Sequence, residues 1–244
     1  MSAAIRIGTS GWHYPHWKKR FYPADVPPAG WLPYYARRLH CVEVNNTFYR
    51  LPDSRTVEGW RAHTPEDFTF TIKASQTITH RKKLKQCGQL VDEFLERLSP
   101  LKDKIDAILF QLPPRWHCNT GRLSTFLECL PPEWRYAFEF RDPSWHDETV
   151  YALLRKANAA LCLYELGDSA TPLITTADFV YIRLHGPAGP YAGSYAVPTL
   201  RYWRERLLRW QKEGKDCWLF FDNDQNAYAV KNAMALQQLL RQDT

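Results

Sequence analysis

Six polar side chains that can transfer protons or hold charge stand near the carboxyl ends of six strand-like segments. Each lies on the face of its segment opposite the apolar residues, and together they are Glu43, Lys73, Gln111, Glu139, Arg183 and His185. Carboxylates and imidazoles transfer protons, whereas lysine and arginine stabilise negative charge. If the fold gathers these segments, the residue types predict acid–base chemistry on an anionic ligand.

The segment 136–146 carries the clearest of these signals. Alternation along the strand Y-A-F-E-F-R places Glu139 and Arg141 on the face opposite Phe138 and Phe140. Charged side chains inside a sheet are costly unless they face a polar site. We therefore expect Glu139 to line such a site, with Arg141 beside it.

Two interpretations of the charged residues remain open at this point. Glu139 and Glu43 could act as general acid and base, as paired carboxylates do in glycoside hydrolysis. They could equally be internal counter-ions for Lys73, Arg141 or Arg183. Lys73 itself could hold an anion, act as a base with a lowered pKa, or form a Schiff base. The absence of an aldolase or decarboxylase motif around it favours the first role or a salt bridge.

Further candidate binding residues flank the strands. They are Asn45 after the second strand, Trp12 and Tyr14 in the loop after the first, His80 in a cationic loop after the third, and Asn223 after the eighth. The loop with Trp12 also carries Lys18, Lys19 and Arg20. It could bind a ring-bearing anion, or it could be a tryptophan-rich lid whose lysines are solvated.

No motif indicates a cofactor. The chain has no G-x-G-x-x-G or G-K-[ST] segment, no H-E-x-x-H, and no G-x-S-x-G around G-T-S-G-W. His185 with Glu43, Glu139 and either Asp222 or Asp224 could bind a divalent metal, although their spacing is not diagnostic. The sequence does not fix the directions in which Asp222, Asn223 and Asp224 point.

Composition predicts one ordinary globular domain over residues 1–244. The chain is 45% hydrophobic and 24% charged, and no linker or repeat divides it. It shows no apolar signal region and no run of roughly 18 apolar residues, so we expect a cytoplasmic protein with no membrane partner. Six widely spaced cysteines favour core thiols over disulfides or zinc. A net charge of +6 favours an anionic partner.

Strand-like and helix-like segments alternate along the whole chain. Strands are predicted at 5–10, 41–49, 68–74, 107–114, 136–141, 160–165, 179–186 and 217–224. Helices are predicted at 31–39, 54–63, 84–104, 122–130, 147–158, 198–212 and 227–241, with 84–104 the longest. Eight strands that alternate with mostly helical connections predict an α/β fold, a TIM-type (β/α)8 barrel. The link between the sixth and seventh strands is too short for a full helix, which should be reduced or missing.

The chain resembles the YecE-like family, known as domain of unknown function 72 (DUF72). Seven blocks carry the resemblance: G-T-S-G-W, E-V-N-N-T-F-Y, F-T-I-K-A with I-T-H-R-K-K-L, F-Q-L-P-P, F-E-F-R-D-P-S-W, Y-I-R-L-H-G-P and F-F-D-N-D. It implies a TIM-type barrel but no catalytic assignment, since the activity of the family is not established. The positions that match its recurring polar residues are Glu43, Asn45, Lys73, His80, Gln111, Glu139, Arg141, Arg183, His185 and Asn223. Asp222 stands where the family often has asparagine.

Two function hypotheses follow. The first is an enzyme of the hydrolase or lyase and isomerase type, acting on a phosphorylated or otherwise anionic small molecule. In it Glu139, Glu43 or His185 moves protons, and Lys73, Arg141 and Arg183 hold the charge. The second is a nucleic-acid-binding or endonuclease-like barrel, with loop cations on phosphates and Trp12, Tyr14 or Trp145 stacking on bases. The sequence does not indicate the oligomeric state.

Overall fold

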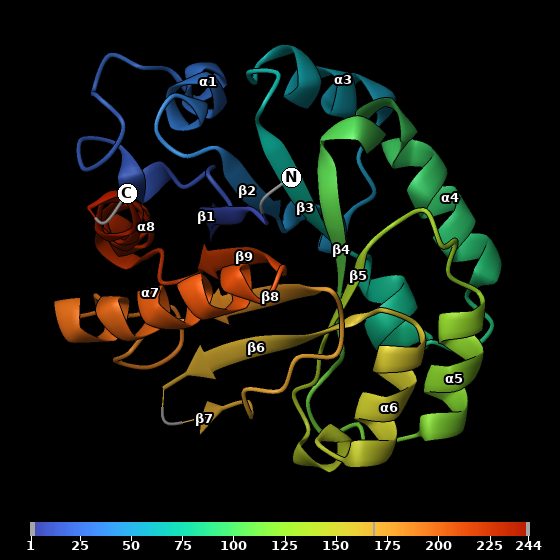
Figure 1. Ribbon diagram of the computed structural model, residues 1–244. Coiled ribbons are helices and arrows are strands. Elements are labelled where there is room, and N and C mark those ends of the chain that lie inside the picture. Colours follow the sequence, from blue (N-terminus) through green and yellow to red (C-terminus); the bar gives the residue numbers. More distant parts are fainter. Residues whose placement is uncertain (1–2, 168, 243–244) are drawn as a thin grey trace.

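The computed structural model describes residues 3–167 and 169–242. Eight parallel strands form a closed barrel with helices on its outside (Figure 1). They are β1 (Ile5–Ser10), β2 (Cys41–Val44), β3 (Thr69–Lys73), β4 (Ile105–Gln111), β5 (Tyr136–Glu139), β6 (Ala160–Leu166), β8 (Phe179–Leu184) and β9 (Asp216–Phe221). Hydrogen bonds between β5 and β6 close the barrel. The predicted TIM-type barrel is confirmed.

Helices connect most of the strands. They are α1 (Trp31–Ala36), α2 (Asn46–Tyr49), α3 (Ser54–Ala62), α4 (Gly88–Leu98), α5 (Thr120–Glu128), α6 (Glu148–Lys156), α7 (Val197–Lys212) and α8 (Tyr228–Arg241). Short turns of 3-10 helix lie at Pro15–Trp17, Pro28–Gly30, Ser99–Lys104, Pro143–Trp145 and Gln225–Ala227, and a π-helical turn lies at Thr77–Arg81. Asp53 and Asp147 begin α3 and α6 by accepting hydrogen bonds from the backbone N–H groups of Thr56 and Thr149.

The described residues between β6 and β8 form no helix. They include only the short strand β7 (Ser169–Ala170), which pairs antiparallel with β6. The hydroxyl oxygens of Thr171 and Thr176 accept hydrogen bonds from the backbone N–H groups of Tyr164 and Leu161. The link therefore packs along β6. The prediction that the helix between β6 and β8 is reduced or missing is confirmed.

Two predicted elements differ most in extent from the observed ones. The second strand ends at Val44 and not at residue 49, because the chain turns into α2 there. The Thr47 hydroxyl donates to the Lys73 carbonyl at 2.6 Å and lies 3.2 Å from the Val44 carbonyl, and so fixes this turn. The predicted helix 84–104 is only α4, since Leu84 and Gln86 have positive φ angles before it and a 3-10 turn follows it. With 16 residues, α7 is longer than the 11 of α4.

Strand alternation divides the apolar residues into two cores. A small cluster fills the barrel interior toward the amino ends of the strands. It includes Cys41, Leu109, Ala137, Tyr181 and Trp218. A much larger cluster lies between the sheet and the helices. The inner stripe predicted for α7 belongs to it, with all four members buried: Leu200, Trp203, Leu207 and Trp210. No disulfide forms among the six cysteines, and four of them are buried. This packing leaves the barrel interior at the carboxyl ends of the strands for polar groups.

Gly8 offers a test of the tight interior packing. A Cβ atom at this position would lie 2.4 Å from the backbone oxygen of Cys41 on the neighbouring strand. We expect Gly8→Ala to lower the free energy of unfolding by roughly 1–3 kcal/mol, because the backbone cannot yield without shifting β1. Urea denaturation measures the change.

Gly59 in α3 provides the matched control for this substitution. No atom lies within 4 Å of a Cβ built there. Gly59→Ala should therefore stabilise the protein by about 0.5–1 kcal/mol through helix propensity. Equal denaturation midpoints for the two variants would contradict the close contact between β1 and β2.

Candidate functional site

The barrel interior changes from apolar to polar toward the carboxyl ends of the strands. Strand register places Ser10 beside Glu43, Glu43 beside Thr71, and Gln111 beside Glu139. Neighbouring residues on parallel strands point to the same face of a sheet. These side chains therefore face the interior at the end of the barrel where sites of this fold are found.

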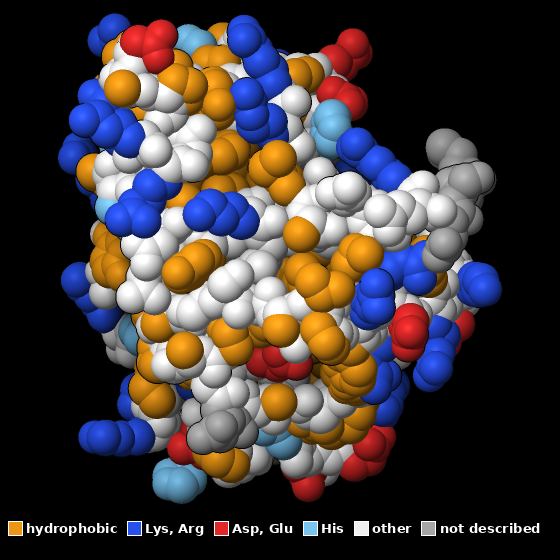
Figure 2. Space-filling view, turned by 90° about the vertical axis from the view of Figure 1, so that its left-hand side faces the viewer, with side chains coloured by type: hydrophobic (Ala, Val, Ile, Leu, Met, Phe, Trp, Pro, Cys, Tyr) orange, Lys and Arg blue, Asp and Glu red, His pale blue; other side chains and the backbone are white. Residues whose placement is uncertain are grey.

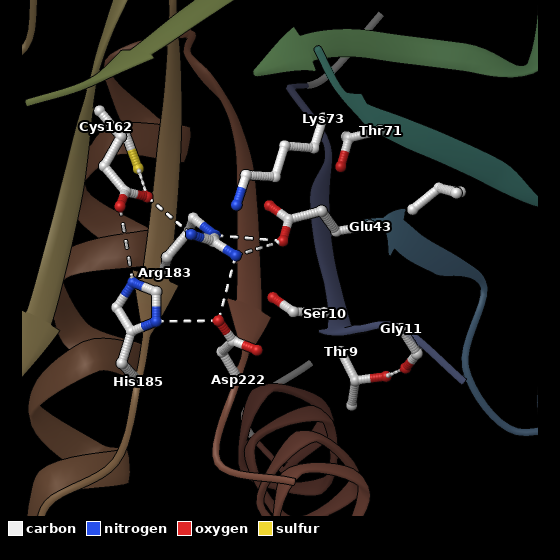
Figure 3. A network of polar contacts seen from close by, with 12 residues as sticks. Thr9, Ser10, Gly11, Glu43, Thr71, Lys73, Cys162, Arg183, His185 and Asp222 are labelled. Atoms are coloured by element: carbon white, nitrogen blue, oxygen red, sulfur yellow. Dashed lines mark hydrogen bonds and ion pairs between the residues drawn. The ribbon is translucent and has the colours of Figure 1, made fainter. Parts of the chain in front are cut away.

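Arg183 occupies the centre of this polar layer and is 1% exposed. Its Nε and Nη2 donate to Glu43 Oε1 at 3.1 and 2.7 Å. Its Nη1 donates to Glu139 Oε2 at 2.8 Å, and Nη2 also donates to Asp222 Oδ2 at 3.1 Å. Figure 3 shows the guanidinium lying between carboxylates from different strands. One buried cation thus ties together three carboxylates.

A second set of contacts joins Arg141 and His185 to the same carboxylates. Arg141 Nε donates to Glu139 Oε1, and Arg141 Nη2 lies 2.9 Å from His185 Nε2. Since arginine can only donate, His185 Nε2 is the acceptor and the proton of the neutral ring sits on Nδ1. That proton is donated to Asp222 Oδ2 at 2.9 Å. His185 therefore links Arg141 to Asp222 as a neutral imidazole.

Glu43 is held on its other oxygen by a buried hydroxyl pair. Tyr181 donates to Glu43 Oε2 at 2.6 Å. Because the single phenol proton is used there, Thr71 Oγ1 must donate to the Tyr181 oxygen at 2.8 Å. Both oxygens of Glu43 are thus engaged, as are both oxygens of Glu139.

The pKa values follow from competition between burial and these partners. Burial alone would raise the pKa of Glu139, but the positive charges of Arg141 and Arg183 hold it well below its ordinary value. Burial likewise opposes ionisation of Asp222, yet Arg183 and His185 lower its pKa. Both groups are ionised carboxylates at neutral pH.

Lys73 differs from every other charged group in the layer. It ends β3 and lies among the same charges, but no hydrogen bond or ion pair from the described residues reaches its ammonium. Its Nζ lies 4.3 Å from the centroid of the Phe48 ring. Burial and the positive charge of Arg183 lower its pKa to about 8, although Glu139 and Glu43 act in the opposite direction. Lys73 is thus a partly desolvated amine that lacks a fixed partner.

Two more buried polar atoms, at the ends of neighbouring strands, lack partners. The Ser10 hydroxyl, on a residue that is 1% exposed, and the Asn45 side-chain oxygen make no hydrogen bond within the described part of the chain. These residues end or directly follow β1 and β2, the two strands before β3. Figure 3 shows the Ser10 hydroxyl and the Lys73 amine turned toward the same central space.

The aromatic loop after β1 contributes one residue near the site. Tyr14 donates to the Ser10 carbonyl at 2.5 Å, and burial with the nearby Asp222 and Asp224 raises the pKa of its phenol. Trp12 is 8% exposed and lines a separate cavity of about 390 Å³ with Trp60. Trp17 is fully buried, and its indole N–H donates to the Asp224 carbonyl. The loop therefore packs as a tryptophan-rich cover.

The remaining predicted residues are divided between the site and its surroundings. His80 packs edge-on against Phe48, and burial and Lys73 lower its pKa. Gln111 shares the interior phase of Glu139 and is partly exposed. Asn223 instead donates to Gly193 and Asn232, outside the charged layer. It supports the loop after β8 and is not brought to the other predicted residues.

The prediction of one ligand contact was wrong. Trp145 was expected to be able to stack on a base, but it is fully buried. Its ring stacks on Phe140 at 4.9 Å, and its indole N–H donates to the Trp116 carbonyl. The turn at Asp142 directs this side chain into the helix layer, so it cannot meet a ligand.

Sequence reasoning missed several residues of the site. Ser10 and Tyr181 lie on the interior face of β1 and β8, and alternation alone could have identified both. Tyr191 gave no periodic signal, because it lies in the irregular loop after β8. Its backbone N–H donates to the His185 carbonyl at 2.6 Å, and its ring lies 6.0 Å from the imidazole. Asp222, whose direction was undetermined, points into the site.

The described residues contain no preformed metal site. No group of three or more His, Cys, Asp or Glu side chains there is arranged to hold an ion. Asp224, the other acidic candidate, turns away and pairs with His16 at 3.2 Å. The carboxylates that point inward are engaged with Arg183.

Comparison with known proteins supplies the family. The model of the family described as "Protein of unknown function DUF72" matches residues 6–244. The chain belongs to the DUF72 family. The described residues contain no helix long and apolar enough to cross a membrane.

Named DUF72 relatives agree with this assignment. The protein YecE of Escherichia coli K12 is 38% identical in an alignment of 150 residues that covers 58% of this chain and 50% of YecE. The chain thus matches about half the length of that relative. YunF of Bacillus subtilis is 26% identical over 97% of this chain and 94% of its own length.

Solved structures of the family share the barrel. A DUF72 protein of Thermotoga maritima superposes with a TM-score of 0.84 at 26% identity, covering 98% of this chain and all of the other. One from Enterococcus faecalis gives a TM-score of 0.83 at 21% identity, covering 97% and 95%. The fold of DUF72 proteins is therefore common to all three chains.

The low pKa of Glu139 leads to a prediction about stability. Glu139→Gln leaves Arg141 and Arg183 underpaired, so it should cost on the order of 3 to 5 kcal/mol at pH 7. The pKa of Glu139 is lower in the folded state than its ordinary 4.5. Its contribution is therefore complete above that value and is lost as pH falls toward the folded-state pKa. Denaturation curves at pH 7 and below 4.5 measure both effects.

Glu148→Gln is the control for Glu139→Gln. Glu148 pairs with Arg155 on the surface and its side chain is 72% exposed, so its loss should change stability by less than about 0.5 kcal/mol. If Glu139→Gln were equally mild, the proposed dependence of the layer on this carboxylate would be refuted.

Proposed function

We propose that the protein is an enzyme that acts on an anionic small molecule by acid–base chemistry at the carboxyl end of the barrel. The observation that carries this proposal is the Lys73 ammonium, which has no hydrogen bond or ion pair within the described residues. A buried ammonium without a partner costs free energy. Proteins retain such costly groups mainly at functional sites, where a ligand supplies the missing partner.

The charge balance supports an anionic ligand. Glu43, Glu139 and Asp222 have Arg183 in common, and Glu139 also pairs with Arg141. Their donors and acceptors are therefore largely used within the layer. Lys73 still has three unused N–H donors, and these suit a phosphate or carboxylate oxygen.

Each remaining group takes a role that follows from its contacts. Of the two interpretations of Glu43 and Glu139, counter-ion is favoured, because both oxygens of each accept hydrogen bonds and the low pKa of Glu139 makes it a weak base. His185 and Asp222 orient Arg141, whose side chain is 12% exposed. Lys73 both holds the anion and transfers the proton, since a pKa near 8 is close to neutral pH.

Lys73→Met tests the proposal. The ammonium has a folded-state pKa of about 8 against an ordinary 10.5, so at pH 7 it destabilises the fold, and this cost declines as pH rises between these values. We expect the variant to be more stable than wild type at pH 7, by up to roughly 3 kcal/mol. Inorganic phosphate should raise the melting temperature of wild type and not that of the variant.

Lys82→Met is the control, because Lys82 is exposed and lies outside the barrel interior. It should keep the stability and the phosphate response of wild type. An equal phosphate shift in Lys73→Met and wild type would exclude Lys73 as the anion-binding group.

One observation favours nucleic acid as a second candidate ligand. Figure 2 views the side toward which β6 and β9 point in Figure 1, and Lys and Arg side chains gather along its edges. The loops after β1, β3 and β4 contribute seven exposed cations, namely Lys18, Lys19, Arg20, Arg81, Lys82, Lys83 and Arg115. Against this role, Trp12 and Trp145 are buried, so they offer no platform for stacking bases.

A binding assay separates the two candidates. We expect fluorescent single-stranded RNA and single- and double-stranded DNA to bind only weakly, and binding to disappear by about 150 mM salt, because exposed cations alone give screened, counterion-driven association. Lys82→Gln with Lys83→Gln should reduce this weak binding. Arg209→Gln with Lys212→Gln on α7 is the charge-matched control. Tight binding at physiological salt that requires Lys82 and Lys83 would favour nucleic acid.

A further inference from the structure

Lys104 and Lys73, two lysines that are at least partly buried, make a useful comparison. Lys104 is 6% exposed, and its ammonium donates to the Thr64 carbonyl, the Thr64 hydroxyl and the Pro65 carbonyl. All three of its donors are used, as a structural role requires. Lys73 lies among charged groups in the barrel, and its ammonium makes no such bond within residues 3–167 and 169–242. A structural role therefore explains Lys104 and leaves Lys73 unexplained.

The surroundings of Lys73 favour the neutral amine. The Phe48 ring lies 4.3 Å from its Nζ, and Arg183 places a fixed positive charge in the same layer. The face of this ring favours the ammonium weakly, whereas burial and the charge of Arg183 disfavour it, and the pKa of about 8 reflects the balance. Desolvated lysines near another cation are the ones that act as amine nucleophiles.

A buried hydroxyl faces the same space as this amine. The Ser10 Oγ is buried and has no partner among the described residues, and Figure 3 shows it facing the same space as Lys73. A hydroxyl both donates and accepts a proton. The oxygen of Asn45, one strand away, is also unpartnered. A ligand that reaches Lys73 would meet the Ser10 hydroxyl.

We infer that Lys73 is a nucleophile that forms an imine with a small carbonyl compound carrying a carboxylate or phosphate group. This inference rests on the proposed function and names its substrate class. The anionic group is favoured because the exposed cations of the surrounding loops attract anions toward the mouth.

The step balances without any further reactant. The ammonium first loses its extra proton to water, and the amine lone pair then attacks the carbonyl carbon to form a C–N bond. The two amine hydrogens leave with the carbonyl oxygen as one molecule of water, relayed by the Ser10 hydroxyl and solvent, and the C=N bond forms. Nothing is oxidised or reduced, and hydrolysis reverses the step.

Reductive trapping tests the inference directly. Wild-type protein is incubated near pH 7.5 with pyruvate, glyoxylate or glyceraldehyde 3-phosphate, sodium cyanoborohydride is added, and the labelled peptides are mapped by mass spectrometry. At that pH a pKa of about 8 in place of 10.5 gives about two hundred times more neutral amine. A less basic amine is a weaker nucleophile, which offsets part of this gain. We still expect Lys73 to be labelled at least about tenfold more than an exposed lysine.

Controls within the chain define the outcome. Lys82 and Lys83 report non-specific labelling of exposed amines, and Lys104 reports burial without nucleophilicity. Lys73→Arg keeps the positive charge and removes the nucleophile, so it should abolish the specific adduct. Ser10→Ala should slow adduct formation while retaining binding of the probe, measured by calorimetry.

Each result has a definite consequence. Labelling concentrated on Lys73 with at least one probe supports the inference. If Lys73 is labelled no more than Lys82 and Lys83 by all three probes, imine formation is refuted. The proposed function then survives only if phosphate or a probe still stabilises wild type and not Lys73→Met, and it fails together with the inference if neither binds.

Discussion

The polar end of the barrel depends on one buried cation, Arg183. A guanidinium inside a β-barrel is tolerated only if its charge is neutralised and its donors are satisfied. Glu43 of β2, Glu139 of β5 and Asp222, which directly follows β9, meet this requirement. Each carboxylate, once desolvated, needs further donors of its own, and Tyr181 and Arg141 are among those that provide them. The whole layer is a consequence of placing one arginine there.

This network also explains why Lys73 is left without a partner. The carboxylates nearest to it are already oriented toward Arg183, and Glu43 has both oxygens occupied. Lys73 therefore experiences their charge only at a distance, which is too weak to offset its burial, and its pKa falls to about 8. Because the carboxylates pair with Arg183, Lys73 has no fixed partner among the described residues and is easily deprotonated. Arg183 stabilises the layer, while Lys73 is available for a ligand.

Much of this arrangement could be predicted from alternation along the strands. Because the barrel is closed and parallel, the phase of Glu139 or Lys73 within its own strand decides whether it faces the interior, and no long-range information is needed. The choice of partners could not be predicted, since Glu139 binds Arg141 and Arg183 by virtue of register across strands. Local turns also escaped prediction. The turn after Asp142 buries Trp145, and α2 replaces the expected end of the second strand.

The position of Lys73 between a rigid network and an aromatic ring bears on how the site would work. Arg183 is fixed by four hydrogen bonds to carboxylates, so its field at Lys73 does not relax when the lysine changes charge. A preorganised field of this kind acts without reorganisation at the moment of reaction. An incoming anion would raise the pKa of Lys73 by pairing with it, whereas a neutral carbonyl group reaching the amine would meet it unprotonated. A ligand with both groups would first pair its anionic group with the Lys73 ammonium, and Arg141 or the surrounding loops would hold that charge once Lys73 has lost its proton and reacts as an amine.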